Sequence, residues 1–211
     1  MNYQAVIFDL DGVICFTDQY HFQAWKEIAD EMGIYFDEKI NNRLRGVSRM
    51  DSLEIILEKY DKPLSLEEKQ KLAEKKNSLY VKLLGGMTEK DLSCEVAETL
   101  GALRKKGIRL AIGSSSKNAK LILERLGLKD YFDAVSDGTN ITKSKPSPEV
   151  FVKAAEFLQK SPPECLVVED AKAGIEAAQN GGFDSAGLGE AAECENVTYA
   201  MSTFSDLLKI V

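Results

Sequence analysis

The chain has 211 residues, a formal net charge of −7 and an apolar fraction of 44%. That length and apolar content allow one large domain with a full hydrophobic core, or a domain with a sizeable insertion. The acidic balance argues against nucleic acid or an anionic membrane as the main partner. No apolar run is long enough to span a bilayer, and the first residues lack the features of a secretory signal. We therefore expect a soluble cytoplasmic protein.

The four cysteines are Cys15, Cys94, Cys165 and Cys194, and no two of them have Cys-x-x-Cys spacing. Because the chain also has a single histidine, a zinc site is not expected. Four cysteines in a chain of this length do not form a disulfide scaffold, since free buried thiols are common. This cysteine usage is typical of a reduced compartment.

An apolar run near the N-terminus, Ala5 to Phe8, leads directly to Asp9, Asp11 and Gly12. Such a run, bounded by a turn signal, predicts a buried strand of a parallel sheet. Ligands of open α/β sheets bind just beyond the carboxyl ends of the strands, where both aspartates would stand. Two carboxylates this close repel each other, and Mg²⁺ would relieve the repulsion because it prefers oxygen ligands. The alternative is a solvated turn, which Asp and Gly also favour.

The next part of the chain is predicted to be helical. Trp25, Ile28, Ala29 and Met32 form one apolar stripe with helical spacing, and Gly33 suits the end of that helix. Further helices are expected at 39–45, in a segment ending at residue 58, and from a capping box of Ser65 and Glu68 to about residue 84.

From residue 95 onwards, predicted helices alternate with predicted strands. The strands are expected at 108–113, 133–136, 166–168, 185–188 and 197–201, and a last helix begins at residue 204. This alternation predicts an α/β fold, with a doubly wound, Rossmann-like parallel sheet. The helical block does not fit the alternation, so we interpret residues 17–84 as an inserted α-helical cap domain. Residues 1–16 and 85–211 would form the core domain.

Four groups of polar residues follow predicted strands: Asp9 with Asp11, then Ser114, then Lys145, then Glu169 with Asp170. In this fold they would meet at one edge of the sheet. Together they have what phosphoryl transfer requires. A carboxylate can attack phosphorus, a second carboxylate can carry a proton, and a lysine with a magnesium ion can neutralise the phosphoryl oxygens. A serine hydroxyl near backbone N–H groups can bind the phosphate.

These groups resemble the motifs of the haloacid dehalogenase superfamily. The motifs are Phe8-Asp9-Leu10-Asp11-Gly12, Gly113-Ser114-Ser115-Ser116, Lys143-Ser144-Lys145-Pro146 and Val168-Glu169-Asp170-Ala171. The resemblance implies Asp9 as nucleophile, Asp11 as general acid and base, and Ser114 and Lys145 on the transferring phosphate. It implies one Mg²⁺ per chain, held by Asp9, the Asp11 backbone carbonyl, Glu169 and Asp170.

The predicted cap is similar to that of the β-phosphoglucomutase family within this superfamily. The motifs are Tyr20-His21-Phe22, Leu44-x-Gly46-Val47-Ser48-Arg49, Lys75-Lys76-Asn77 and, in the core, Ser116-Lys117-Asn118. The similarity implies interconversion of β-D-glucose 1-phosphate and D-glucose 6-phosphate, through an aspartyl-phosphate enzyme and a glucose 1,6-bisphosphate intermediate. Arg49 would bind a second, distal phosphate bidentately, with Ser116, Lys117 and Asn118. Gly46 and Val47 would contact the sugar through their backbone, and the remaining substrate contacts implied are Thr17, His21, Trp25, Ser48, Ser52, Lys76 and Ser115.

Other interpretations stay open at this point. A sugar-phosphate phosphatase would use the same core, with water in place of a sugar hydroxyl as the attacking group. A regulatory protein that binds phosphosugars without turnover is a third hypothesis, although the intact acidic pair and Lys145 argue against it. Lys76 lies in a charge run that is typical of a solvated helix face, while His21 and Trp25 could simply pack inside the cap. We expect a monomer that acts on small sugar phosphates.

Overall fold

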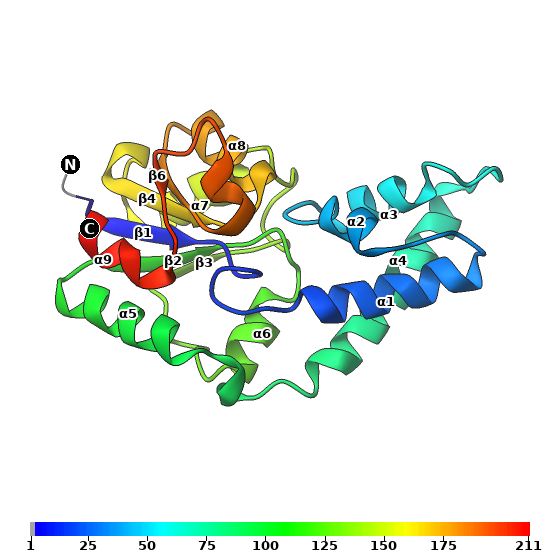
Figure 1. The fold of residues 1–211 in the computed structure, drawn as a ribbon, viewed down its shortest axis with the longest axis horizontal. Coiled ribbons are helices and arrows are strands. Elements are labelled where there is room, and N and C mark those ends of the chain that lie inside the picture. The colour runs from blue at the N-terminus through cyan, green and yellow to red at the C-terminus, as the bar shows by residue number, and fades with distance from the viewer. Residues whose placement is uncertain (1–2) are drawn as a thin grey trace.

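A computed structural model describes residues 3–211 and contains one six-stranded sheet beside a block of helices (Figure 1). The strand order is β3-β2-β1-β4-β5-β6, and every neighbouring pair is parallel. The strands are β1 (Ala5–Phe8), β2 (Arg109–Gly113), β3 (Ala134–Ser136), β4 (Cys165–Glu169), β5 (Asp184–Gly187) and β6 (Tyr199–Ala200). The predicted doubly wound parallel sheet is confirmed.

Helices cover both faces of the sheet, as Figure 1 shows. They are α5 (Cys94–Lys105), α6 (Ala119–Arg125), α7 (Glu149–Leu158), α8 (Lys172–Asn180) and α9 (Leu207–Ile210). Successive side chains of a strand point to opposite faces, and β1 follows this rule. Val6 and Phe8 pack in the cluster that contains α5, α6 and α9, whereas Ala5 and Ile7 pack in the cluster of α7 and α8. Because both faces are buried, β1 consists of apolar residues alone.

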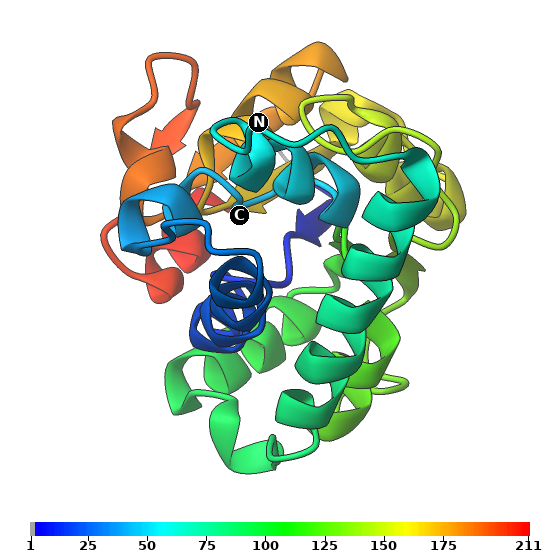
Figure 2. The ribbon, with the colours of Figure 1, turned by 90° about the vertical axis from the view of Figure 1, so that its right-hand side faces the viewer.

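The inserted helices are α1 (Asp18–Glu31), α2 (Glu38–Asn42), α3 (Arg49–Leu57) and α4 (Leu66–Leu84). They have their own apolar cluster, in which Trp25, Ile28 and Leu53 are almost fully buried. Figure 2 looks onto these inserted helices, in which α1 and α4 pack against each other. The predicted capping box is present, since Ser65 N–H donates to Glu68 Oε2 at 2.7 Å. The limits of 17 and 84 for a cap domain remain our proposal.

Three predicted elements are shorter than expected. The helix predicted at 39–45 ends at Asn42, because the N–H groups of Arg43 and Leu44 bond three residues back and the chain then turns. The strand predicted at 197–201 is only the two-residue edge strand β6. The last helix begins with a short 3₁₀ segment, Phe204–Asp206. Other 3₁₀ segments are Glu89–Asp91, Pro162–Glu164 and Gly189–Glu193.

Two further findings concern membrane spans and cysteines. Within residues 3–211, no helix combines the length and the apolar character needed to cross a bilayer. Each cysteine is a free thiol, with Cys15 and Cys165 buried.

Candidate active site

The carboxyl ends of three adjacent strands place polar side chains together. Phe8 of β1 is in register with Ile112 of β2 and Val168 of β4, so the residues that follow emerge at the same edge. Asp9 comes directly after β1, and its N–H donates to the Val168 carbonyl at 2.9 Å. Ser114 follows β2 and is buried, with its Oγ accepting a hydrogen bond from Ser116 N–H at 3.1 Å.

Lys145 lies behind this edge as a buried cation between two carboxylates. Its Nζ donates to Asp9 Oδ1 and to Glu169 Oε1, and the side chains of Lys145 and Glu169 are fully buried. Burial alone would lower the pKa of Lys145, but the Asp9 and Glu169 carboxylates outweigh it and raise the pKa. The ammonium therefore stays charged next to the predicted nucleophile.

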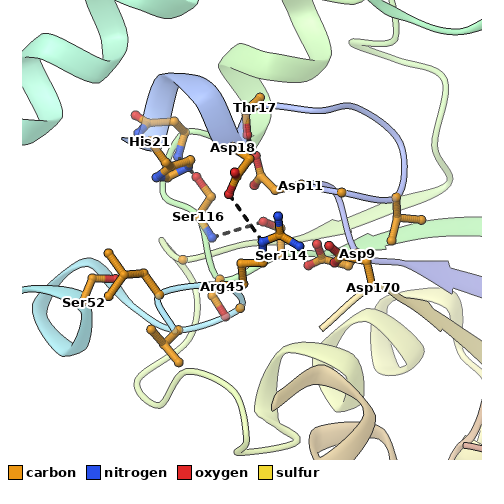
Figure 3. Close-up of a pocket in the computed structure, with 18 of the residues that line it drawn as sticks. Asp9, Asp11, Thr17, Asp18, His21, Arg45, Ser52, Ser114, Ser116 and Asp170 are labelled. Atoms are coloured by element: carbon orange, nitrogen blue, oxygen red, sulfur yellow. Dashed lines mark hydrogen bonds and ion pairs between the residues drawn. The ribbon is translucent and has the colours of Figure 1, made fainter. Parts of the chain in front are cut away.

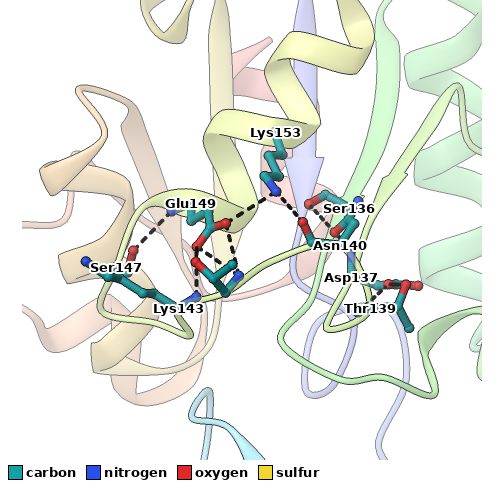
Figure 4. A network of polar contacts seen from close by, with 9 residues as sticks. Ser136, Asp137, Thr139, Asn140, Lys143, Ser147, Glu149 and Lys153 are labelled. Carbon is teal, nitrogen blue, oxygen red and sulfur yellow. Dashed lines mark hydrogen bonds and ion pairs between the residues drawn. The ribbon is translucent and has the colours of Figure 1, made fainter.

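The loop that carries Lys145 is held by Glu149 at the start of α7 (Figure 4). The Glu149 carboxylate accepts hydrogen bonds from the N–H of Lys143 at 2.8 Å and from the N–H of Thr142 at 3.0 Å, and it pairs with Lys153 at 3.3 Å. Hydrogen bonds from Lys143 and Thr142 lower the pKa of Glu149 to about 2. An acceptor that stays charged at neutral pH thus fixes the backbone just before Lys145.

Three carboxylates form a group that could hold a metal ion. One oxygen each of Asp9, Glu169 and Asp170 lies within 4.8 Å of the others. Burial, and then the charge of Glu169, raises the pKa of Asp170 to about 7. Two glycines leave the space for these carboxylates, because a Cβ on Gly174 would lie 1.9 Å from the Glu169 carboxyl and one on Gly12 would lie 2.0 Å from Asp170. This set of hard oxygen donors fits Mg²⁺.

Asp11 has a different environment from Asp9. Its Oδ1 accepts a hydrogen bond from the hydroxyl of Thr17 (Figure 3), and its carboxylate does not belong to the metal-binding group. Burial raises the pKa of Asp11, although the Thr17 hydroxyl, Lys145 and Lys76 oppose the shift. A raised pKa allows this carboxyl to hold and release a proton, as a general acid and base must.

A cavity of about 1370 Å³ lies between the sheet edge and the inserted helices. Asp9, Asp11 and Asp170 line its core side (Figure 3). Lys145 and Glu169 do not line it: Lys145 contacts Asp9 from behind, and Glu169 contacts Lys145. The other predicted site residues also line it: Thr17, His21, Trp25, Gly46, Val47, Ser48, Arg49, Ser52, Lys76, Ser114, Ser115, Ser116, Lys117 and Asn118. The structure thus brings the predicted residues together around one space.

Lys76 is buried, so the interpretation of its charge run as a solvated face is wrong at this position. The residue is 2% exposed, and its Nζ lies 2.8 Å from His21 Nδ1 and over the rings of Trp25 and Tyr80. Burial and then the Arg49 charge lower the pKa of Lys76 to about 7. Burial also lowers the pKa of His21 well below its usual value. These groups make a basic but poorly solvated wall, in which burial disfavours the charged forms of Lys76 and His21.

Three further polar residues of the cavity region were not singled out as site residues from the sequence. Arg45 Nε lies 3.4 Å from Asp18 Oδ1 (Figure 3), and both side chains line the cavity. Asn77 Oδ1 accepts hydrogen bonds from Arg49 and from Asn118. Asn77 stands next to Lys76 in a motif noted above, and this position is the one sequence feature that could have indicated its role. No sequence feature indicates that Arg45 pairs with Asp18.

Comparisons with known proteins agree with this fold. The family model of the haloacid dehalogenase-like hydrolases matches residues 3–182. A β-phosphoglucomutase of Bacillus subtilis is 41% identical over 97% of this chain and 91% of its own length. A phosphorylated carbohydrates phosphatase of Thermotoga maritima is 33% identical over 86% of this chain and 82% of its own.

A solved structure extends the comparison to the whole fold. The crystal structure of a β-phosphoglucomutase from Clostridium difficile covers 97% of this chain, and this chain covers 93% of it, with a TM-score of 0.90 and 38% identity. Since the family model spans most of the chain and relatives above 30% identity cover nearly all of it, the chain belongs to the haloacid dehalogenase-like hydrolase family.

Proposed function

We propose that the protein transfers a phosphoryl group within sugar phosphates and interconverts β-D-glucose 1-phosphate and D-glucose 6-phosphate. The observation that carries the proposal is a cavity with two chemically different ends. Its core end has the acidic group at Asp9, and the other end has the basic residues Arg49, Lys76 and Lys117. With Mg²⁺ bound among its carboxylates and Lys145 beside Asp9, the core end could take one phosphate of a substrate, and the basic end could take a second. The identity with a β-phosphoglucomutase supports the choice of sugar.

In this proposal Asp9 attacks the phosphorus atom. An Asp9 oxygen forms a bond to phosphorus, and the bond from phosphorus to the sugar oxygen breaks. Lys145 neutralises negative charge on Asp9 and the phosphoryl oxygens, and the Ser114 hydroxyl donates a hydrogen bond to a phosphoryl oxygen. Asp9, Glu169, Asp170 and the Asp11 carbonyl would hold Mg²⁺, which supplies positive charge to the phosphoryl group when bound.

Asp11 handles the proton. When phosphate leaves the sugar, protonated Asp11 gives its proton to the sugar oxygen; in the reverse step it takes the proton from the attacking hydroxyl. The hydrogen bond from Thr17, at the start of the inserted helices, holds the Asp11 carboxyl in place. A sugar hydroxyl that attacks phospho-Asp9 yields glucose 1,6-bisphosphate. This intermediate must then reorient in the cavity so that its other phosphate reaches Asp9.

Phosphorus NMR tests the proposal. β-Glucose 1-phosphate, a trace of glucose 1,6-bisphosphate and Mg²⁺ are mixed with the protein. We expect glucose 6-phosphate as the main product. Free phosphate as the main product would instead support a sugar-phosphate phosphatase, the alternative that the Thermotoga relative favours. Tight binding of the sugar phosphate without any product would favour a regulatory binding protein.

A further inference from the structure

Asn77 of α4 joins two of the residues that we propose to hold the distal phosphate. Its Oδ1 accepts a hydrogen bond from Arg49 Nη2 at 2.7 Å and another from Asn118 Nδ2 at 2.9 Å. Arg49 begins α3 among the inserted helices, whereas Asn118 lies in the core just before α6. One amide oxygen therefore links the two parts of the molecule at the distal end of the cavity.

The charges around this link are unusual for α4. Lys69, Lys71 and Lys75 of the same helix each pair with a glutamate. By contrast, the ion pairs found within residues 3–211 include neither Arg49 nor Lys117 nor Lys76. Arg49 thus has a neutral oxygen as its partner where an arginine commonly has a carboxylate.

A neutral partner has a clear consequence for an anion. A carboxylate at position 77 would pair with Arg49 and compete with any phosphate for the guanidinium. An apolar residue there would leave the long Arg49 side chain without a fixed orientation and would leave Asn118 without a link to the inserted helices. An amide avoids both problems, because it accepts hydrogen bonds but adds no charge.

We propose that Asn77 is a positioning residue that holds Arg49 against the core without neutralising it, and thereby sets the preference of the distal subsite for a phosphate group. The identity of that anion as a second phosphate of the substrate rests on the proposed function.

The test compares a substrate that has a distal phosphate with one that lacks it. The kcat and KM values for glucose 1,6-bisphosphate and for acetyl phosphate are measured in Mg²⁺ for the unsubstituted chain and for Asn77→Asp. Asn77→Asp has nearly the same shape and adds one negative charge beside Arg49. We expect kcat/KM for the bisphosphate to fall roughly tenfold or more relative to acetyl phosphate, mainly through KM. A general loss of structure would instead lower kcat/KM for both substrates alike.

Ser78→Asp is the matched control, because it adds the same charge one residue further along α4 at an exposed position. It should leave the ratio of the two kcat/KM values unchanged. Asn77→Ala, which removes both hydrogen bonds without adding charge, should lower the ratio by roughly two- to tenfold. If thermal unfolding shows that Asn77→Asp does not fold, Asn77→Ala decides the question.

An unchanged ratio in Asn77→Asp or, where that variant does not fold, in Asn77→Ala would overturn the inference. The ratio of kcat/KM for glucose 1,6-bisphosphate to that for acetyl phosphate tests the distal subsite whether the phosphoryl group on Asp9 next passes to a sugar or to water. Failure of the proposed function is therefore seen separately, in the phosphorus NMR experiment, as free phosphate that the unsubstituted chain forms from β-glucose 1-phosphate as the main product.

Discussion

Lys76 is a buried amine whose charge should depend on what the cavity holds. Burial and then the charge of Arg49 lower its pKa to about 7, and the charge of Asp11 opposes this shift. His21 and the Tyr80 ring also contact the amine. At pH 8 the free amine is therefore mostly neutral. A phosphate dianion bound nearby would raise its pKa again and draw a proton onto it.

We thus expect glucose 6-phosphate to bind at pH 8 with net proton uptake. Calorimetry in buffers of different ionisation enthalpy measures the number of protons taken up. The sugar phosphate is already a dianion at this pH, so the proton taken up from the buffer must bind to a group of the protein. Lys76→Met should remove most of the uptake, and equal uptake in that variant would show that another group is responsible.

Arg49 gives a second prediction at the scale of one residue. If it binds a distal phosphate, Arg49→Ala should lower kcat/KM for β-glucose 1-phosphate, measured with catalytic glucose 1,6-bisphosphate, roughly 10- to 100-fold more than kcat/KM for acetyl phosphate. Steady-state kinetics on the two substrates measures this difference. Equal losses would remove Arg49 from the distal subsite.

At the scale of elements, the loop between β3 and α7 supports two parts of the site. Near α7, Glu149 fixes the backbone before Lys145. Near β3, the N–H of Gly138 donates to the Ser116 carbonyl at 3.1 Å. A Cβ at Gly138 would lie 2.4 Å from the Ser115 carbonyl oxygen and 2.9 Å from Lys117 N. Only a residue without a side chain fits there.

Gly138→Ala should therefore displace the Ser116–Asn118 segment. We expect a loss of about 1–3 kcal/mol in the free energy of unfolding, together with a raised KM for glucose 1,6-bisphosphate. Gly101→Ala in α5 is the control, because no atom lies within 4 Å of its added Cβ and alanine favours a helix. Denaturant unfolding and kinetics measure both effects. If the two variants behaved alike, the close approach at Gly138 would not matter.

The elements themselves were largely predictable from local patterns. The apolar run before Asp9 indicated β1 because a strand buried on both faces needs apolar residues throughout. Ser65 and Glu68 indicated the start of α4 because the capping box is a local interaction. Strand β6 was predicted too long, because its extent depends on how far β5 reaches beside it. Local sequence patterns of this kind predict the structure of a segment but not which other segments pack or pair with it.

At the scale of the whole molecule, the core site was more predictable than the cavity around it. The carboxyl ends of parallel strands meet at one edge, so Asp9, Ser114 and Glu169 could be grouped without a structure. The link from Asn77 to Asn118 was not predictable, since it joins residues 41 positions apart across two parts of the fold. The same holds for the hydrogen bond from Ser144 to Asp51 at 2.8 Å. The monomeric state remains a prediction.

The central claim is that the carboxylate of Asp9 accepts the phosphoryl group. The most direct measurement is mass spectrometry of the protein after rapid acid quench of its reaction with acetyl phosphate and Mg²⁺. We predict one phosphoryl group on the peptide that contains Asp9, and none in Asp9→Asn, which should also lose turnover. A phosphoryl group on another residue, or turnover that persists in Asp9→Asn, would contradict the account.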